Sequence, residues 1–337
     1  MRARLEVGEL TIELPTAKGW VRPVDGVTFR LGRGESLGIV GESGSGKTML
    51  ALALMGLTPP GARVKGQAVL HLASRAENAE RSGAAAAANR TVDLVKVSGE
   101  EMRAIRGAQI GMIFQEPMTA LDPVLRVRDQ IEETIRVHER GLSRAEVRRR
   151  AIEALEQAAV PEPERRARQY PHELSGGLRQ RALIAMALAA GPSVLIADEP
   201  TTALDVTVQK QILELLAELR RGLNLSLIFI THDLGVVAQI AERVLVMYAG
   251  RIVEDGPAQE VLRNPRHPYT EGLLRAAPRL QRGHIKPIPG TVPELDALPP
   301  GCSFAPRCER HISDCDAAVP ELRQIDDERR ARCILAR

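Results

Sequence analysis

The sequence predicts an α/β fold with a parallel sheet, interrupted by a helical block and followed by a tail. A short apolar run at residues 37–40 meets a glycine-rich turn and then a helix. The β pattern returns at residues 194–197, 225–230 and 244–248, with helical stretches between the runs, which is typical of βα units. The chain has 337 residues, 44% of them apolar, so it can bury a sizeable core.

Two half-buried strands are expected at the start of the chain, because apolar residues nearly alternate there. These residues are Leu5, Val7, Leu10, Ile12 and Leu14, and then Val27, Phe29 and Leu31. The helix after the glycine-rich turn is predicted to begin at Gly46 and to stop at Pro59-Pro60. Residues 73–90 are rich in Ala, Glu, Arg and Asn and are interpreted as a surface insertion, mobile or loosely helical.

The middle of the chain changes from strand to helix. Residues 110–114 are predicted to form a buried strand, and from about residue 127 to residue 188 the pattern is helical. Ser143 followed by Glu146 predicts a capping box at the start of one of these helices. After about residue 257 the chain is rich in Pro and Arg and loses clear periodicity, so this region is predicted to be a separate tail.

Composition and charge argue against a nucleic-acid partner. The chain has 46 basic and 43 acidic residues, a net charge of +3 and only 2% aromatic residues. Arginine runs at 148–150, 165–168 and 329–332 are therefore expected to be solvated faces. Residues 1–14 mix charged and apolar residues and do not have the pattern of a signal segment, and the longest apolar stretch, 182–197, is broken by a Gly-Pro pair. We expect a cytosolic chain that works at a membrane only through a partner.

The glycine-rich turn carries the most specific motif. It fits G-x-x-x-x-G-K-[ST] with Gly41, Glu42, Ser43, Gly44, Ser45, Gly46, Lys47 and Thr48. A preceding strand and a following helix are the expected context of a phosphate-binding loop, and they disfavour an accidental glycine-rich turn. Backbone N–H groups and the helix N-terminus then cradle the phosphates. Lys47 is expected to reach the β- and γ-phosphates, and the Thr48 hydroxyl to bind Mg²⁺.

Two carboxylates end a later apolar strand. Asp198 and Glu199 follow residues 194–197 directly. Because successive strand residues face opposite sides, Asp198 is expected beside the phosphate loop, where it can hold Mg²⁺ through water. Glu199 is expected to orient an attacking water. The alternative, an exposed acidic turn, is disfavoured by the phosphate loop on the same chain.

Ser175, Gly176 and Gly177 stand just before the predicted helix at residues 181–190. A serine and two glycines at a helix start can bind an anion through backbone N–H groups and the helix dipole. The alternative is a simple N-cap, since serine is a favoured N-cap residue. Taken by itself, this motif favours the simple N-cap.

In combination and in this order, the motifs resemble those of the nucleotide-binding subunits of ABC transporters, over residues 4–260. Residues 41–48 resemble the Walker A motif, and residues 174–180 resemble the ABC signature. Asp198 and Glu199 resemble the Walker B aspartate and the catalytic glutamate.

Further residues match other motifs of that family. Gln115 resembles the Q-loop glutamine, Asp205 the D-loop aspartate, and His232 the switch histidine that contacts the γ-phosphate. Trp20 lies where an aromatic ring usually stacks on adenine, with a packing role as the alternative. Leu178 departs from the family, because many signatures have Gln there.

The resemblance implies a P-loop NTPase fold, with a RecA-like core, an antiparallel β subdomain and a helical subdomain at about residues 115–180. It implies ATP and Mg²⁺ as cofactors, with Mg²⁺ held by Thr48, Gln115 and Asp198. Glu199 is then the general base for water, and His232 is the second catalytic residue. The implied activity is transport-coupled ATP hydrolysis.

The resemblance also implies an assembly. ATP lies between the phosphate loop of one subunit and the signature of a second, giving a heterodimer of ATPase subunits. Two transmembrane permease subunits contact the helical subdomain, and an extracytoplasmic binding protein supplies the substrate. The chain is then a peripheral translocase subunit at the cytoplasmic face of the cell membrane.

All of the cysteines lie after residue 301, at Cys302, Cys308, Cys315 and Cys333. Disulfides are not expected in a cytosolic chain. Four thiolates suit a zinc ion or an iron–sulfur cluster, and the absence of a C-x-x-C pair disfavours zinc. Four unliganded thiols remain an alternative.

Residues 267–270 and 300–308 resemble the C-terminal region of oligopeptide and dipeptide importer ATPases. The resemblance implies a cassette at residues 1–260 and an extension at 261–337. Some members of that family carry a 4Fe–4S cluster on such cysteines, which implies the four cysteines as its ligands. Peptide uptake is the implied function, and uptake of nickel chelates, opines or oligosaccharides is the alternative.

Two other classes of protein are alternatives. A soluble ABC ATPase of translation or DNA repair usually carries two cassettes or a long coiled-coil insertion, and neither is present in this sequence. A metal-dependent regulatory or nucleic-acid-binding module would place the main function in the tail. The balanced net charge disfavours that reading.

Overall fold

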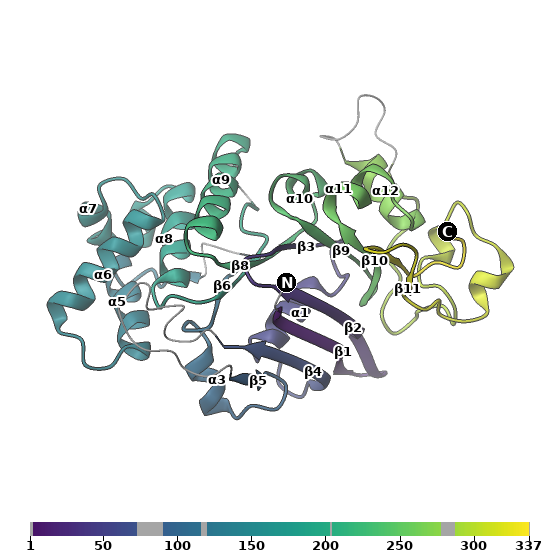
Figure 1. Cartoon of the computed structure of the whole chain (residues 1–337), viewed down its shortest axis with the longest axis horizontal. Coiled ribbons are helices and arrows are strands. Elements are labelled where there is room, and N and C mark those ends of the chain that lie inside the picture. The colour runs from purple at the N-terminus through teal and green to yellow at the C-terminus, as the bar shows by residue number, and fades with distance from the viewer. Residues whose placement is uncertain (1–2, 73–89, 116–119, 203, 278–286, 337) are drawn as a thin grey trace.

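The computed structural model describes residues 3–72, 90–115, 120–202, 204–277 and 287–336. Of the expected insertion at 73–90, only Arg90 belongs to these residues, and it is exposed. The described chain forms an antiparallel sheet, a larger and mostly parallel sheet, and a helical block (Figure 1). The predicted α/β fold is therefore confirmed.

The N-terminal strands form a four-stranded antiparallel sheet in the order β2-β1-β4-β5. Their bounds are Ala3–Thr16 for β1, Gly19–Gly32 for β2, Arg63–His71 for β4 and Thr91–Asp93 for β5. The apolar residues that alternate in the sequence, Leu5 to Ile12 in β1 and Val27 to Leu31 in β2, are buried. The two strands predicted at the start of the chain are confirmed.

The large sheet has eight strands in the order β11-β12-β10-β9-β3-β8-β7-β6. Their bounds are Ser36–Val40 (β3), Ile110–Ile113 (β6), Val194–Asp198 (β7), Ser226–Thr231 (β8), Arg243–Tyr248 (β9), Arg251–Pro257 (β10), Arg323–Gln324 (β11) and Arg330–Ala331 (β12). Strand β3 runs parallel to β8 and β9, and β7 runs parallel to β6 and β8. The carboxyl ends of these parallel strands therefore meet at one edge.

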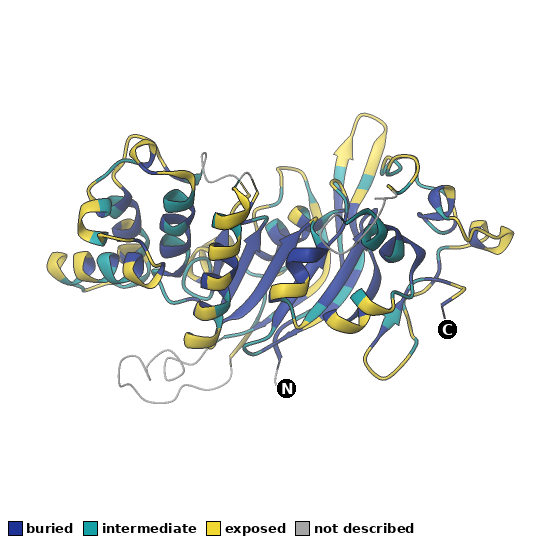
Figure 2. Cartoon of the chain, turned by 90° about the horizontal axis from the view of Figure 1, so that it is seen from above, coloured by how far each residue is buried: buried dark blue, intermediate teal, exposed yellow. Residues whose placement is uncertain are grey.

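Helices connect the strands of the large sheet. They are α1 (Lys47–Leu54), α3 (Gly99–Ile105), α9 (Val206–Gly222), α10 (Leu234–Ile240), α11 (Ala258–Arg263) and α12 (Pro268–Ala276). The central strands are buried on both faces (Figure 2). In β7, Val194 and Ile196 pack with the N-terminal sheet, whereas Leu195 and Ala197 pack with the helical block. This two-sided burial explains why the strand is continuously apolar in the sequence.

The helical block contains α5 (Val127–His138), α6 (Arg144–Gln157), α7 (Pro163–Ala167), the short 3-10 helix η1 (Pro171–Glu173) and α8 (Gly176–Leu188). The Ser143 side chain accepts a hydrogen bond from the Glu146 N–H, but Glu146 turns to Arg149 and Arg150 instead of completing the predicted box. No helix within the described ranges is long and apolar enough to span a membrane.

The tail is less separate than its sequence suggests. Beyond α12 it contains two short 3-10 helices, η2 (Ala305–Arg307) and η3 (Ser313–Asp316), and the strands β11 and β12. Strand β12 pairs with β10 and so extends the large sheet.

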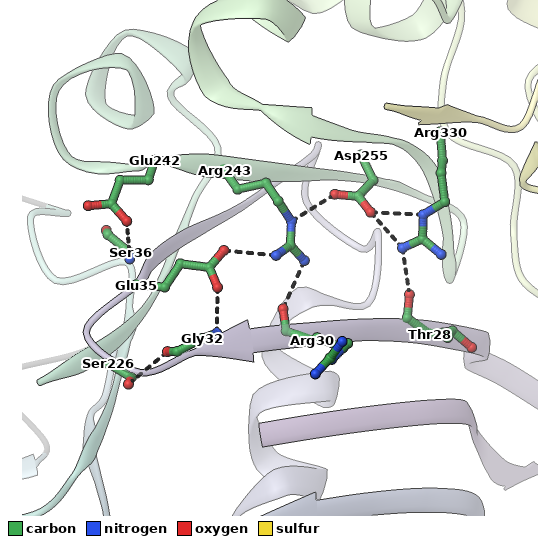
Figure 3. A network of polar contacts seen from close by, with 10 residues as sticks. All are labelled: Thr28, Arg30, Gly32, Glu35, Ser36, Ser226, Glu242, Arg243, Asp255 and Arg330. Atoms are coloured by element: carbon green, nitrogen blue, oxygen red, sulfur yellow. Dashed lines mark hydrogen bonds and ion pairs between the residues drawn. The ribbon is translucent and has the colours of Figure 1, made fainter. Parts of the chain in front are cut away.

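A network of ion pairs fixes this join between the tail and the sheet (Figure 3). Asp255 of β10 accepts from Arg243 at 3.0 Å and from Arg330 of β12 at 2.5 Å, and Arg330 also donates to the Thr28 carbonyl. Next to it, Arg329 is buried against Glu254. The expectation that residues 329–332 form a solvated face is therefore wrong, because these arginines neutralise buried carboxylates.

Candidate functional site

The phosphate-binding loop joins the carboxyl end of β3 to the start of α1. The loop glycines Gly44 and Gly46 have positive φ, and Gly46 precedes the helix directly. Ser45 and Lys47 are buried, whereas Ser43, Gly44 and Thr48 are exposed. The backbone therefore makes the tight turn that the motif predicts and leaves part of the loop open to a ligand.

Lys47 is held inside the curve of the loop. Its Nζ donates to the carbonyls of Gly41 at 2.8 Å and Glu42 at 2.9 Å. Burial lowers the pKa of Lys47, and the charges of Glu199, Asp198 and Glu42 act in the opposite direction. The charged ammonium group is therefore held inside the loop, where it can donate to the oxygens of an anionic ligand.

Asp198 ends β7 beside the loop and is almost fully buried. Burial raises the pKa of Asp198, and a hydrogen bond with the Thr48 side chain opposes this shift. Among the described residues, its Oδ1 atom has no hydrogen-bond partner. A buried carboxylate with a spare oxygen, next to a hydroxyl, fits the donor set that Mg²⁺ prefers.

Glu199 lies at the centre of a polar cluster at the same edge of the sheet. Its Oε2 is 3.2 Å from Nδ1 of His232 and 3.3 Å from Nε2 of Gln115, and it accepts from the Thr202 hydroxyl at 2.9 Å. The hydrogen bond with His232 is the main cause that lowers the pKa of Glu199, against the effect of burial. Glu199 has a φ of 47°, in the left-handed region that is costly for a residue with a side chain.

The pair of Glu199 and His232 predicts a pH dependence. The hydrogen bond with Glu199 raises the pKa of His232 above 6.5. This interaction therefore stabilises the folded chain fully below about pH 6.5, and its contribution is lost as pH rises through the folded-state pKa of His232. In an NMR titration, E199Q is expected to lower the pKa of His232.

The control for this titration is E242Q, which changes an exposed glutamate paired with Arg220. It is expected to leave the titration of His232 unchanged. An unchanged titration in E199Q would show that Glu199 does not stabilise the protonated imidazole.

The predicted signature residues lie at the start of α8. Ser175 is the N-cap, and its hydroxyl accepts from the Leu178 N–H at 3.4 Å. A Cβ added at Gly177 would lie 2.9 Å from Val208 of α9, so the two helix starts touch. Asp205 caps α9 by accepting the N–H groups of Thr207 and Val208. The N-cap role is therefore confirmed, and the anion-binding role stays a prediction.

The structure thus brings together Lys47, Thr48, Gln115, Asp198, Glu199 and His232. Ser175, Gly176 and Asp205 are exposed at the starts of α8 and α9. Trp20 is 45% exposed in the β1–β2 hairpin, and the Arg63 guanidinium lies 3.8 Å from the centre of its ring. Its predicted contact with adenine stays a prediction.

The four cysteines line one small pocket together with Phe304, Ile334 and Leu335. None of these cysteines is in a disulfide. Burial raises the pKa of the Cys302 and Cys308 thiols, and the other cysteines add to the shift. Within the part of the chain that the structure describes, no three His, Cys, Asp or Glu side chains are grouped so that they could hold a metal ion.

Sequence reasoning missed one set of contacts to the phosphate loop. The Glu42 carboxylate pairs with Arg307 of the tail, and the Glu42 N–H donates to the Tyr269 hydroxyl of α12. No periodicity or spacing connects residues so far apart in the chain. The available signal was that Tyr269 and Arg307 both lie in the tail segments that resemble one family.

The fold and this site define an ATP-binding cassette. The family model for the ABC transporter matches residues 24–202, and the chain belongs to that family. It is an ABC-type ATPase. A second family model, the oligopeptide/dipeptide transporter C-terminal region, matches residues 253–315.

Relatives and solved structures agree with this assignment. A Brucella abortus (strain 2308) chain named as a peptide import ATP-binding protein is 51% identical, covering 92% of this chain and 90% of the relative. The oligopeptide transport ATP-binding protein OppD of Bacillus subtilis (strain 168) is 49% identical, covering 96% and 86%. The dimeric cassette MJ0796, in a post-hydrolysis state bound to ADP and Pi, has a TM-score of 0.62 at 27% identity, covering 75% of this chain and 98% of that chain.

Proposed function

We propose that this chain binds and hydrolyses ATP to power the uptake of di- or oligopeptides through a membrane permease. The observation that carries the proposal is the convergence of Lys47, Asp198, Glu199 and His232 at the carboxyl edge of the large sheet. The match of the tail to the oligopeptide/dipeptide transporter C-terminal region supports a peptide as the substrate.

The loop at residues 41–48 binds the phosphates in this proposal. Its backbone N–H groups and Lys47 replace the water around the phosphate oxygens. Thr48, Asp198 and Gln115 hold Mg²⁺, which supplies positive charge to the phosphates. The unpartnered Oδ1 of Asp198 supports this assignment.

Glu199 acts as the general base that orients and deprotonates the attacking water. Its contacts with His232 and Gln115 fix the carboxylate, and its lowered pKa keeps it ionised. In the complex with ATP, His232 turns to the γ-phosphate. General-base catalysis of this kind contributes about 10²–10⁴-fold.

A second ATPase subunit completes the site. The exposed Ser175 and Gly176 of one subunit, with the half-buried Gly177, face the phosphate loop of the other, and Asp205 lies at the same surface. The dimeric state of MJ0796 supports a dimer, which we infer to be a heterodimer. Trp20 stacks on the adenine through its exposed ring.

The helical block provides the surface for two permease subunits. A groove of about 380 Å³ is lined by α5 residues and by Leu125 and Met186. Val137, which lines the groove, is 61% exposed, and Val124, next to Leu125, is 75% exposed. Exposed apolar residues beside a groove support a protein contact. The chain then works as a peripheral subunit at the cytoplasmic face, and an extracytoplasmic binding protein selects the peptide.

Copurification tests this function. The tagged chain is expected to bring down a second ATPase subunit and two membrane permeases, and vesicles carrying the complex are expected to accumulate a labelled peptide with ATP. Accumulation of a nickel chelate, an opine or an oligosaccharide instead would overturn the peptide assignment. An active chain with no permease partner would indicate a soluble ABC ATPase.

We further infer that residues 261–337 form an extension to the cassette at residues 1–260 and that its four cysteines bind a 4Fe–4S cluster. The shared pocket of the four thiols and the lack of disulfides support this inference. In the described chain these thiols are not grouped as a metal site, so the cluster requires them to draw together around it. Four thiolates are the usual ligand set of such a cluster. When bound, the cluster would link the parts of the extension that carry the four cysteines.

Protein purified without oxygen tests the cluster. About four iron and four acid-labile sulfide atoms per chain are expected, as a 4Fe–4S cluster requires. C302S is expected to lower both together. Zinc in place of iron and sulfide, or the absence of all three, would contradict the cluster.

A further inference from the structure

An arginine of the C-terminal extension reaches the phosphate-binding loop. Arg307 has a side chain that is only 4% exposed. It donates two hydrogen bonds to the Glu42 carboxylate, from Nη1 at 2.7 Å and from Nη2 at 3.0 Å. A two-point contact of this kind fixes both the charge and the orientation of the carboxylate.

The same loop residue is held a second time through its backbone. The Glu42 N–H donates to the hydroxyl of Tyr269 at 2.8 Å. Tyr269 is fully buried in α12, and its ring packs against Tyr248, with centroids 4.6 Å apart, and against Phe304. The support for Glu42 is therefore a packed aromatic cluster and not a mobile side chain.

Arg307 is itself held in place from the extension. Its Nε donates to the carbonyl of Pro289 at 2.9 Å, and its Nη1 lies 3.4 Å from the Tyr248 hydroxyl. Because the guanidinium is planar, these contacts leave it one orientation toward Glu42. The extension therefore presents a fixed positive charge to the loop.

The charge on Glu42 matters because Lys47 lies next to it. The Glu42 carbonyl accepts from Lys47 Nζ at 2.9 Å. Without Arg307, the Glu42 carboxylate would be free to attract Lys47 and to repel the phosphates of a nucleotide. With Arg307, that negative charge is paired with the positive charge of the guanidinium.

We propose that Arg307 is a positioning residue for nucleotide binding, acting through Glu42, so that the C-terminal extension prepares the phosphate-binding loop. This proposal rests on ATP binding by residues 41–48. It assigns to the extension a role in nucleotide affinity.

A double-mutant cycle on the full-length chain tests the proposal, with MgATP affinity measured by calorimetry. R307M is expected to weaken MgATP binding about tenfold. E42Q removes the carboxylate that Arg307 neutralises, so R307M in the E42Q background is expected to change the affinity by less than about twofold. In the assembled complex, R307M is expected to raise KM for ATP more than it lowers kcat.

R275M is the matched control, because Arg275 lies in the same extension and pairs with Glu309 and not with a residue of the loop. It is expected to leave MgATP affinity unchanged. R307K keeps the positive charge but cannot make the two-point contact of the guanidinium, so MgATP affinity is expected to lie between those of the unmodified chain and R307M. This variant preserves the test if R307M does not fold.

If R307M weakens MgATP binding equally in the unmodified chain and in E42Q, Arg307 has a merely structural role and the proposal is overturned. Unchanged affinity in R307M and in R307K would overturn it as well. If the unmodified chain fails to bind MgATP, the assignment of the phosphate loop itself is wrong, which distinguishes the two failures.

Discussion

E199Q is expected to leave ATP binding intact and to lower the ATP turnover of the assembled complex about 10²–10⁴-fold. Glutamine has nearly the same shape as glutamate and can keep the contacts with Gln115 and Thr202, so the site should retain its geometry. It cannot accept a proton from water at neutral pH. The substitution therefore removes the general base and little else.

Two measurements separate this role from a structural one. MgATP affinity and the single-turnover rate should be measured on the same preparation, because only the rate is expected to fall. E214Q is a suitable control, since Glu214 lies on the exposed side of α9 and pairs with Lys210. Substantial remaining hydrolysis in E199Q would refute the assignment, and lost ATP binding would show that Glu199 holds the nucleotide instead.

The sequence predicted the parts of the molecule that depend on local rules. The strand, glycine-rich turn and helix around residues 41–48 are determined by neighbouring residues, and so is the continuously apolar strand β7. The α8 N-cap at Ser175 is also local. Because these elements follow local rules, Lys47 and Asp198 could be predicted as site residues before their contacts were known.

Helix capping shows where local rules stop. The predicted box at Ser143 is only half formed, whereas Ser98 and Glu101 form a complete one that the sequence analysis did not select. Both segments carry the same Ser-x-x-Glu pattern. The difference is that Glu146 has arginines within reach one turn further on, and an ion pair competes with the backbone N–H for the carboxylate.

The tail could not be predicted because its contacts are long-range. The pairing of β12 with β10 and the burial of Arg329 against Glu254 join residues about seventy-five positions apart. Arg307 and Glu42 are separated by 265 positions. Hydrophobic periodicity carries no information about such pairs, so a segment rich in Pro and Arg was interpreted as a separate and solvated region.

G46A is expected to abolish ATP binding, with an affinity at least about 100-fold lower. Gly46 has a φ of 100°, and a Cβ added there would lie 2.0 Å from the carbonyl oxygen of Pro23. That oxygen belongs to the backbone of β2, so the loop and not the neighbour must move. We expect a loss of about 2–5 kcal/mol in the free energy of unfolding, from backbone strain and overpacking together.

G44A provides the matched comparison, because Gly44 also has a positive φ, 79°, but no heavy atom lies within 4 Å of its added Cβ in the described chain. Only the strain of the left-handed backbone remains, which costs about 1–2 kcal/mol. G44A should therefore bind MgATP far better than G46A, as measured by calorimetry, with urea unfolding reporting stability. Equal loss of MgATP binding in both variants would mean that the left-handed backbone alone, and not the contact with β2, determines whether the loop can bind the phosphates. Retained binding in G46A would show that close contact between the loop and β2 is not needed to position the phosphates.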